Sequence, residues 1–111
     1  MKGRLSAAVW VAAYLRRAAG AHKPAVVVRR GDAMAGQVLI RVDRCDGSGV
    51  VLAPSMGLDG GRIWLRATGP RPVSWAETQA YLDRQVKHDP DLWVVDIEAR
   101  DDNPLLEEPI V

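Results

Sequence analysis

The middle of the chain consists of short runs rich in β-branched residues, each bounded by glycine, proline or aspartate. Valine and isoleucine favour extended backbone, whereas Asp-Gly pairs favour tight turns. The pattern therefore predicts four consecutive strands that pair as an antiparallel meander. These strands are expected over residues 25–30, 37–44, 50–53, where Pro54 ends the strand, and 62–68.

Two segments outside this region carry apolar residues at helical spacing. The first covers residues 5–19, with arginines near its C-terminal end and with Gly20 as a left-handed stop. The second begins at Ser74, which forms a capping-box sequence with Glu77, and it ends before Asp89 and Pro90. We expect a helix in each segment.

The last regular segment, residues 92–100, alternates apolar residues with mostly charged ones, which is typical of a strand with one buried face. A chain of 111 residues is the size of one domain. We therefore predict a single α+β domain over residues 1–111, with residues 102–111 as a flexible acidic tail. Its mostly antiparallel sheet has about five strands, both helices pack on one face, and the element order is α-β-β-β-β-α-β.

The N-terminus imitates a signal peptide, because Lys2 and Arg4 precede an apolar run and Ala19-Gly20-Ala21 resembles a cleavage site. Arg16 and Arg17 interrupt the run where a signal peptide carries no charge. The run is also shorter than the roughly 20 apolar residues needed to span a bilayer. We expect a cytoplasmic protein with no membrane span.

Candidate metal ligands are few and widely spaced. Cys45 is the single cysteine, so it has no partner for an internal disulfide and does not form a structural zinc site alone. His22 and His88 lie far apart in the sequence, and no known ligand spacing links them. We expect no metal and no cofactor.

The two halves of the chain carry opposite charge although the net charge is only +1. Residues 1–71 hold 12 Lys or Arg against 4 Asp or Glu, whereas residues 72–111 hold 3 against 10. Strand alternation in the predicted meander places five basic or aromatic residues on one sheet face: Arg29, Arg41, Arg62, Trp64 and Arg66. Such a face suits a protein partner, or single-stranded nucleic acid held by arginine–phosphate contacts and base stacking on the indole.

A less demanding interpretation is that the acidic C-terminal half covers these arginines within the fold. Asp96, Glu98 and the acidic tail supply the carboxylates, and such pairs remove the positive potential that a nucleic acid needs. The two interpretations differ in whether Arg41, Arg62 and Arg66 have carboxylate neighbours.

Asp96 and Glu98 also form a candidate catalytic pair, since residues two apart on a strand point to the same side. In hydrolases, two carboxylates that lie close together on one side of a site serve as the general acid and the general base. No pocket or third partner is visible in the sequence, and solvated or arginine-paired carboxylates are the commoner case.

Three segments resemble a family of short alphaproteobacterial proteins of about 110 residues, catalogued as a domain of unknown function. They are Arg29-Arg30-Gly31-Asp32 with Ala35-Gly36, Thr68-Gly69-Pro70, and the run from Asp89 to Glu98. The likeness extends from Trp10 to about Asp101. It implies that the first helix belongs to the mature domain, and it implies no activity, cofactor or catalytic residue.

Three functions remain open at this point. The first is a non-enzymatic protein-interaction module, which binds a protein partner or itself through the Arg/Trp face or the acidic C-terminal segment. The alternative is a nucleic-acid-binding module that uses the Arg/Trp face. The third is a small enzyme that uses Asp96 and Glu98.

Overall fold

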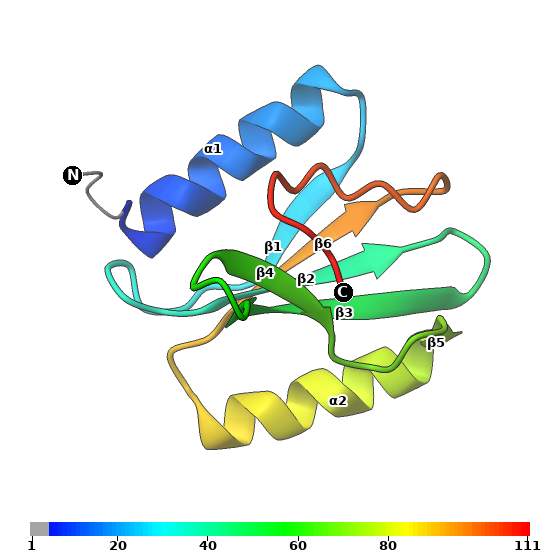
Figure 1. The fold of residues 1–111 in the computed structure, drawn as a ribbon. Helices are drawn as coiled ribbons and strands as arrows, with labels where there is room; N and C mark the ends of the chain where they lie inside the picture. The colour runs from blue at the N-terminus through cyan, green and yellow to red at the C-terminus, as the bar shows by residue number, and fades with distance from the viewer. Residues whose placement is uncertain (1–4) are drawn as a thin grey trace.

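The computed structural model describes residues 5–111, so Lys2 and Arg4 of the signal-peptide argument lie outside the described residues. The predicted α+β class and element order are confirmed, with one additional short strand before the second helix (Figure 1). The elements are α1 (Ala7–Gly20), β1 (Ala25–Arg29), β2 (Val38–Asp43), β3 (Ser48–Met56), β4 (Arg62–Arg66), β5 (Val73–Ser74), α2 (Trp75–His88) and β6 (Trp93–Glu98).

The sheet has the strand order β1-β6-β2-β3-β4, and β5 pairs with β3 beside β4. Strand β6 lies between β1 and β2, antiparallel to β1 and parallel to β2, so the predicted meander is wrong at its first step. Of the residues of β6, Trp93, Val94, Val95 and Ile97 are buried, which means that both of its faces are covered. A strand that is apolar on both faces takes a central position, and β6 therefore separates the first two strands.

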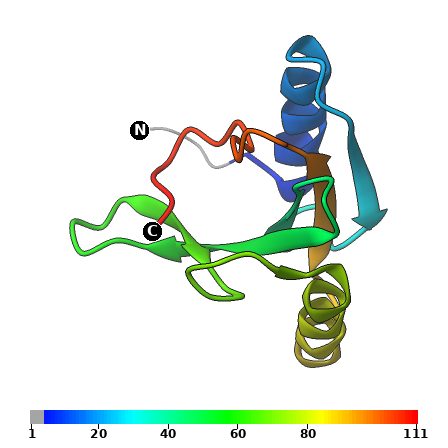
Figure 2. The ribbon, with the colours of Figure 1, turned by 90° about the vertical axis from the view of Figure 1, so that its right-hand side faces the viewer.

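The two helices lie on opposite faces of the sheet (Figure 2), so the predicted packing of both on one face is also wrong. Tyr14 of α1 belongs to the same buried cluster as Ile40, whereas Leu82 of α2 belongs to the cluster of Leu39. Leu39 and Ile40 are neighbours in β2 and point to opposite faces. Because the central strands are apolar on both faces, each face requires its own helix.

Strand β3 is longer than the predicted segment 50–53 and contains Pro54. Its pairing with β2 ends at Leu52, whereas its pairing with β4 continues to Met56. Proline is tolerated where one side of a strand has no partner. The outer parts of β3 and β4 therefore form a two-stranded hairpin that projects from the body of the molecule (Figure 2).

Each helix begins directly after its N-cap residue. The Ser74 hydroxyl accepts a hydrogen bond from Glu77 N–H at 3.2 Å, as the capping-box sequence predicts. At the end of α1, however, Gly20 is helical and His22 adopts the left-handed conformation with a φ of 59°. Lys23 N–H then donates to the Ala18 carbonyl at 2.9 Å, which closes the helix two residues later than Gly20 predicts.

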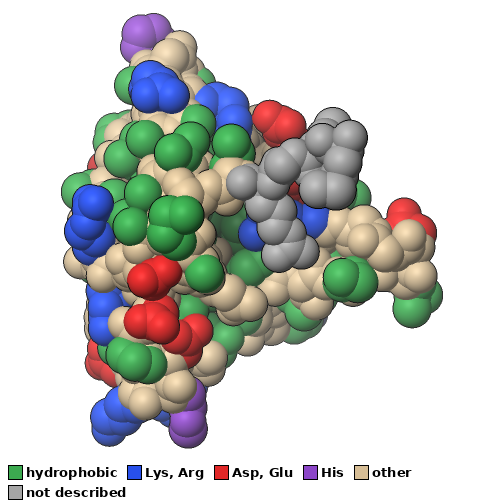
Figure 3. All heavy atoms as spheres, turned by 90° about the vertical axis from the view of Figure 1, so that its left-hand side faces the viewer, with side chains coloured by type: hydrophobic (Ala, Val, Ile, Leu, Met, Phe, Trp, Pro, Cys, Tyr) green, Lys and Arg blue, Asp and Glu red, His purple; other side chains and the backbone are tan. Residues whose placement is uncertain are grey.

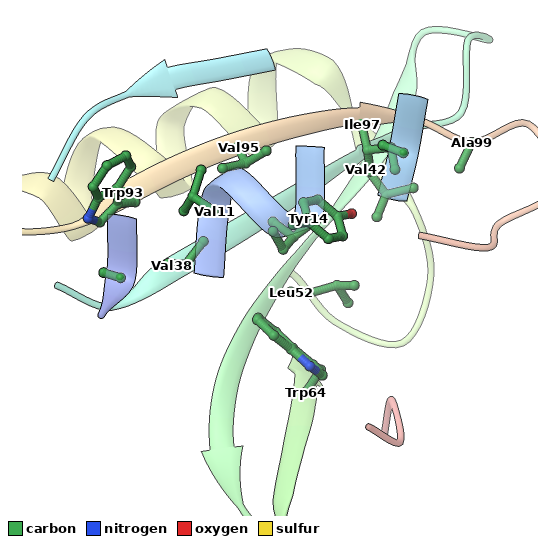
Figure 4. Packing of buried hydrophobic residues seen from close by; sticks show 13 residues of the cluster. Val11, Tyr14, Val38, Val42, Leu52, Trp64, Trp93, Val95, Ile97 and Ala99 are labelled. Atoms are coloured by element: carbon green, nitrogen blue, oxygen red, sulfur yellow. The ribbon is translucent and has the colours of Figure 1, made fainter. Parts of the chain in front are cut away.

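The larger core lies between α1 and the sheet. Figure 4 shows Val11 and Tyr14 of α1 beside Val38, Val95 and Leu52 of the strands. The Tyr14 hydroxyl donates to the Pro104 carbonyl at 2.6 Å, and burial raises the Tyr14 pKa far above its ordinary value. The chain after β6 thus returns to α1 and closes this core.

Candidate interaction surfaces

Arg41 of β2 is buried beneath α2 and has a carboxylate neighbour. Its guanidinium donates from Nε and Nη2 to the two carboxylate oxygens of Asp96, both at 2.9 Å. Nη1 donates to Gln79 Oε1 at 2.9 Å, and the Trp75 ring centroid lies 4.0 Å from Cζ. With 4% of its side chain exposed, Arg41 joins the sheet to α2 and is not available to an external ligand.

Trp64 of β4 is fully buried on the opposite face, next to Trp10 of α1. Its indole N–H donates to Glu108 Oε1 at 3.0 Å. The backbone of β4 is bonded to the same terminal segment, with Trp64 N–H donating to Pro109 O and Val111 N–H to Trp64 O, both at 2.8 Å. The indole therefore has no exposed face on which a nucleobase stacks in this conformation.

The other three predicted arginines are divided between the two sheet faces: Arg62 and Arg66 share the α1 side with Trp64, and the Arg62 Cζ lies 5.4 Å from the Trp64 ring centroid. Arg62 and Arg66 are exposed on the α1 side, in register with Met56 and Leu52 of β3. Arg29 lies on the α2 side and donates to the Pro90 carbonyl at 3.0 Å. The premise that all five residues share one face is wrong, because β4 pairs in a register that turns Trp64 toward the side of Ile40. Whether any of the five binds a ligand stays a prediction.

The acidic C-terminal segment packs against the fold along α1 and β4. Arg17 donates from Nε to the Leu105 carbonyl at 3.1 Å and pairs with Glu107 at 3.4 Å. Leu105, Leu106 and Ile110 contact the larger core. These contacts argue against the predicted flexibility of residues 102–111. Whether this segment moves in solution stays a prediction.

The two carboxylates of the candidate catalytic pair have different surroundings. Asp96 is occupied by Arg41, whereas Glu98 is exposed and accepts a contact from the Cys45 thiol at 3.6 Å. Partial burial, with help from the Asp43 and Glu98 carboxylates, raises the Cys45 thiol pKa above its ordinary value. Neither Asp96 nor Glu98 lines the hollow between the end of α1 and β1 or the groove between β1 and α2.

Ligand sites of other kinds are equally unsupported. No group of three or more His, Cys, Asp or Glu residues within residues 5–111 is arranged to hold a metal ion. No helix in the same range is long and apolar enough to cross a membrane. Every fully buried side-chain nitrogen or oxygen there has a hydrogen-bond partner, so no polar group is left pointing into an empty site.

The surface that the sequence arguments missed lies where β1 meets α2. Val26 and Val28 of β1 are 58% and 48% exposed, although β-branched residues in a strand are usually covered. A groove beside them is lined by Leu82, Val86 and Val94 and has the charged residues Asp83 and Lys87 at its rim. The valine run was visible in the sequence, but only the strand order shows that it forms a sheet edge.

Figure 3 shows the molecule from the side opposite to Figure 2, with the hairpin arm projecting to the right and hydrophobic side chains exposed near its tip. The exposed apolar residues of the arm are Met56, Leu58 and Leu65. On the left of this view, hydrophobic and cationic side chains are interspersed over the surface of the body. The apolar surface of the arm is carried by a projecting two-stranded ribbon, whereas that of β1 borders the main sheet.

These features define a class: a small α+β protein with a mixed sheet between two helices, and with exposed apolar side chains at one edge of that sheet. Within that class, the chain belongs to the family described as a protein of unknown function (DUF1491), whose sequence profile matches residues 5–107. The resemblance stated from the sequence is thereby confirmed.

Solved structures agree with this assignment. A crystal structure of a DUF1491 family protein from Caulobacter crescentus is 40% identical, covers 97% of this chain and 100% of its own, and has a TM-score of 0.86. An NMR structure of a DUF1491 family protein from the same organism is 39% identical over 99% of both chains, with a TM-score of 0.83. A solution structure of an A. tumefaciens protein is 28% identical over 96% of this chain and 95% of its own, with a TM-score of 0.78. No curated protein matched the chain.

Proposed function

We propose that this protein is a non-enzymatic protein-interaction module that binds an extended protein segment at the β1 edge. The observation that carries the proposal is the pair of half-exposed valines, Val26 and Val28, on a terminal strand of the sheet. Edge strands offer unpaired backbone groups to an added strand, and side chains beside them provide selectivity.

The groove beside β1 supports this proposal. Leu82, Val86 and Val94 provide an apolar floor, and Asp83 and Lys87 provide charges at the rim. An apolar centre with a polar rim is the usual anatomy of a protein-binding surface. An added strand therefore places alternate apolar side chains beside the valines and over this groove.

The Arg/Trp face and the acidic segment of the original hypothesis are weaker candidates. Arg41 is paired with Asp96, and Trp64 is paired with Glu108 of the acidic segment itself. The proposal therefore keeps the interaction function and moves its location to β1.

Nucleic-acid binding remains the alternative, favoured by the exposed Arg62 and Arg66, for which no ion pair forms within the described residues. It predicts that retained nucleic acid is lost at high salt and in an Arg62→Ala/Arg66→Ala variant. An enzyme based on Asp96 and Glu98 has less support, since the Asp96 carboxylate already accepts hydrogen bonds from the Arg41 guanidinium.

A cytoplasmic location is part of the same proposal. Cleavage after Ala21 removes all of α1, including Val11, Tyr14 and Ala18 of the larger core. A domain that depends on this helix for its core is poorly suited to lose it during export.

The test compares the tagged full chain with two variants in a host-cell lysate, with and without nuclease. Val26→Lys/Val28→Lys places charges on the β1 surface, and Val9→Lys is the control, because Val9 is 51% exposed on α1. We expect a protein to be retained by the wild type and by Val9→Lys, independently of nuclease, and to be lost with the double variant. Retention that is unaffected by the double variant, or that disappears with nuclease, refutes the proposal.

A further inference from the structure

We infer that the protein segment bound at β1 is β1 of a second copy of this chain. The two strands pair antiparallel about Val27, so that two sheets join into one across a two-fold axis. This inference rests on the proposed function, since it names the partner that the same edge takes.

The backbone of β1 is arranged for such pairing. Glu98 N–H donates to the Pro24 carbonyl at 2.9 Å, and Val26 faces Asp96 one step further along the ladder. Residues between the hydrogen-bonded pairs of an antiparallel ladder direct their N–H and C=O groups away from the partner. Ala25 and Val27 therefore point theirs to the outer edge, where no backbone group of residues 5–111 bonds to them.

The side chains of β1 are self-complementary. Val26, Val27 and Val28 read the same in both directions, so pairing about Val27 sets Val26 of one copy opposite Val28 of the other. Val27 packs toward α1, whereas Val28 lines the groove beside α2, so the exposed valines of both copies meet on the α2 side. The half-exposed apolar surface is thereby covered without any other partner.

The charges around β1 are compatible with a second copy. Arg29 comes level with Ala25 of the second copy, and the register shift after Val27 turns its side chain to the α2 side. The two arginines are then about 13 Å apart along the strands. Asp83 and Lys87 are one helical turn apart at the groove rim. A two-fold axis reverses the order of these two positions in the second copy, which is compatible with attraction between the acidic position of one rim and the basic position of the other.

The expected interface is small. Strand β1 has five residues, and its pairing with β6 shifts register between Val27 and Arg29, which limits the regular part of the ladder. Interfaces below about 1,200 Å² belong to the weak and transient class. The dimer should therefore form reversibly at roughly micromolar concentrations rather than as a permanent assembly.

The test is sedimentation equilibrium of the full chain from about 5 to 500 µM, combined with backbone amide exchange measured by NMR. We expect a reversible dimer in which the Ala25 and Val27 amides exchange more slowly as concentration rises. Val26→Lys/Val28→Lys should raise the dissociation constant by about 100-fold or more, because it brings four like charges together. The equally exposed Val9→Lys should leave it within about twofold.

A second variant guards against misfolding. Val26→Thr/Val28→Thr keeps β-branched side chains and removes apolar surface, so it should fold and weaken the dimer by about tenfold. A wild type that is monomeric up to 500 µM, or a dimer that both valine variants leave intact, overturns the inference. If the chain is monomeric while a different protein from the lysate is still lost with the lysine variant, the self-pairing falls and the proposed function stands. If neither is observed, both fall.

Discussion

Arg41 shows how one buried residue links secondary-structure elements that are far apart in the sequence. It belongs to β2, and its guanidinium is held by Asp96 of β6 and Gln79 of α2 while it stacks on Trp75. A buried charge is tolerated only when its hydrogen-bonding groups are satisfied, and here each guanidinium nitrogen has a partner. The arginine thus fixes the position of α2 on the sheet.

We expect Asp96→Ala to lower the free energy of unfolding by about 3 kcal/mol, because it leaves the Arg41 charge buried and unpaired. Adding Arg41→Met should recover at least about 1 kcal/mol, since the uncompensated charge is then gone. Urea denaturation of the wild type, both single variants and the double variant measures this coupling. A change of less than about 0.5 kcal/mol in Asp96→Ala would show that water replaces the carboxylate at no cost.

Alanine substitution is expected to have opposite effects on stability at two glycines. A Cβ on Gly31 overlaps the Asp91 carbonyl and approaches the Trp93 ring, whereas a Cβ on Gly20 meets nothing within 4 Å. We expect Gly31→Ala to destabilise the fold by about 1–3 kcal/mol through overpacking. Gly20→Ala should stabilise it by about 0.4–1 kcal/mol, since Gly20 is helical. Chemical denaturation of both variants tests this, and equal effects would contradict it.

At the scale of elements, the two edges of the sheet are treated differently. The β4 edge is covered by the C-terminal segment, which adds a short parallel bridge between Trp64 and Ile110. The β1 edge has no such cover among the described residues, and the side chains of its Val26 and Val28 are about half exposed. A covered edge is protected from pairing with other chains, and an open one is available to them.

Removing residues 105–111 should therefore expose β4 and the aromatic residues beneath it. We expect a lower thermal midpoint and faster quenching of tryptophan fluorescence by acrylamide, since Trp64 loses Glu108 and its cover. Glu108→Gln is the control, because its amide oxygen still accepts the indole hydrogen bond and it leaves the segment in place. A truncated chain with wild-type quenching would show that residues 105–111 are mobile in solution, as the sequence suggested.

At the scale of the whole molecule, the opposite charges of the two halves pair with each other. Of the five ion pairs among the described residues, four join a cation from residues 1–71 to a carboxylate from residues 72–111. The exception is Arg44 with Asp46. The expected internal pairing of the sheet-face arginines is therefore confirmed for Arg41, whereas no ion pair of the described residues includes Arg29, Arg62 or Arg66.

Acid should weaken the fold through two exposed aspartates. The Lys23 ammonium lowers the pKa of Asp101, and the hydroxyl and N–H of Ser48 lower the pKa of Asp46. A folded-state pKa below the unfolded value of about 3.9 contributes stability above that pH, and the contribution is lost as the pH falls through the folded pKa.

We accordingly expect the free energy of unfolding to fall as the pH is lowered from about 5 toward 2. The Asp46→Asn/Asp101→Asn variant should show a shallower fall, and Asp91→Asn, at another exposed position, should match the wild type. Urea denaturation at several pH values measures these slopes. Identical slopes for all three proteins would remove the two aspartates from the explanation.

Local residue patterns predicted the elements because their causes are local. Valine runs, the Ser74–Glu77 capping box and the Asp-Gly turns act over a few residues, so six of the eight elements were expected close to their observed bounds. The errors arose where distant chain segments meet: β3 continues through Pro54 because β2 no longer pairs there, and the two-residue β5 forms only against β3. Those interactions have no signature within a short window.

What the sequence determined by itself is the α+β class, the order of the elements, the division of charge and the membership of the family. The tertiary structure alone decided that β6 enters between β1 and β2 and that each helix takes its own face. The register of β4 on β3 placed Trp64 on the side opposite to Arg41, and the strand order left Val26 and Val28 at an open edge. The physical reason is that strand order and sheet face depend on which apolar surfaces cover each other, a property of the whole chain rather than of any segment.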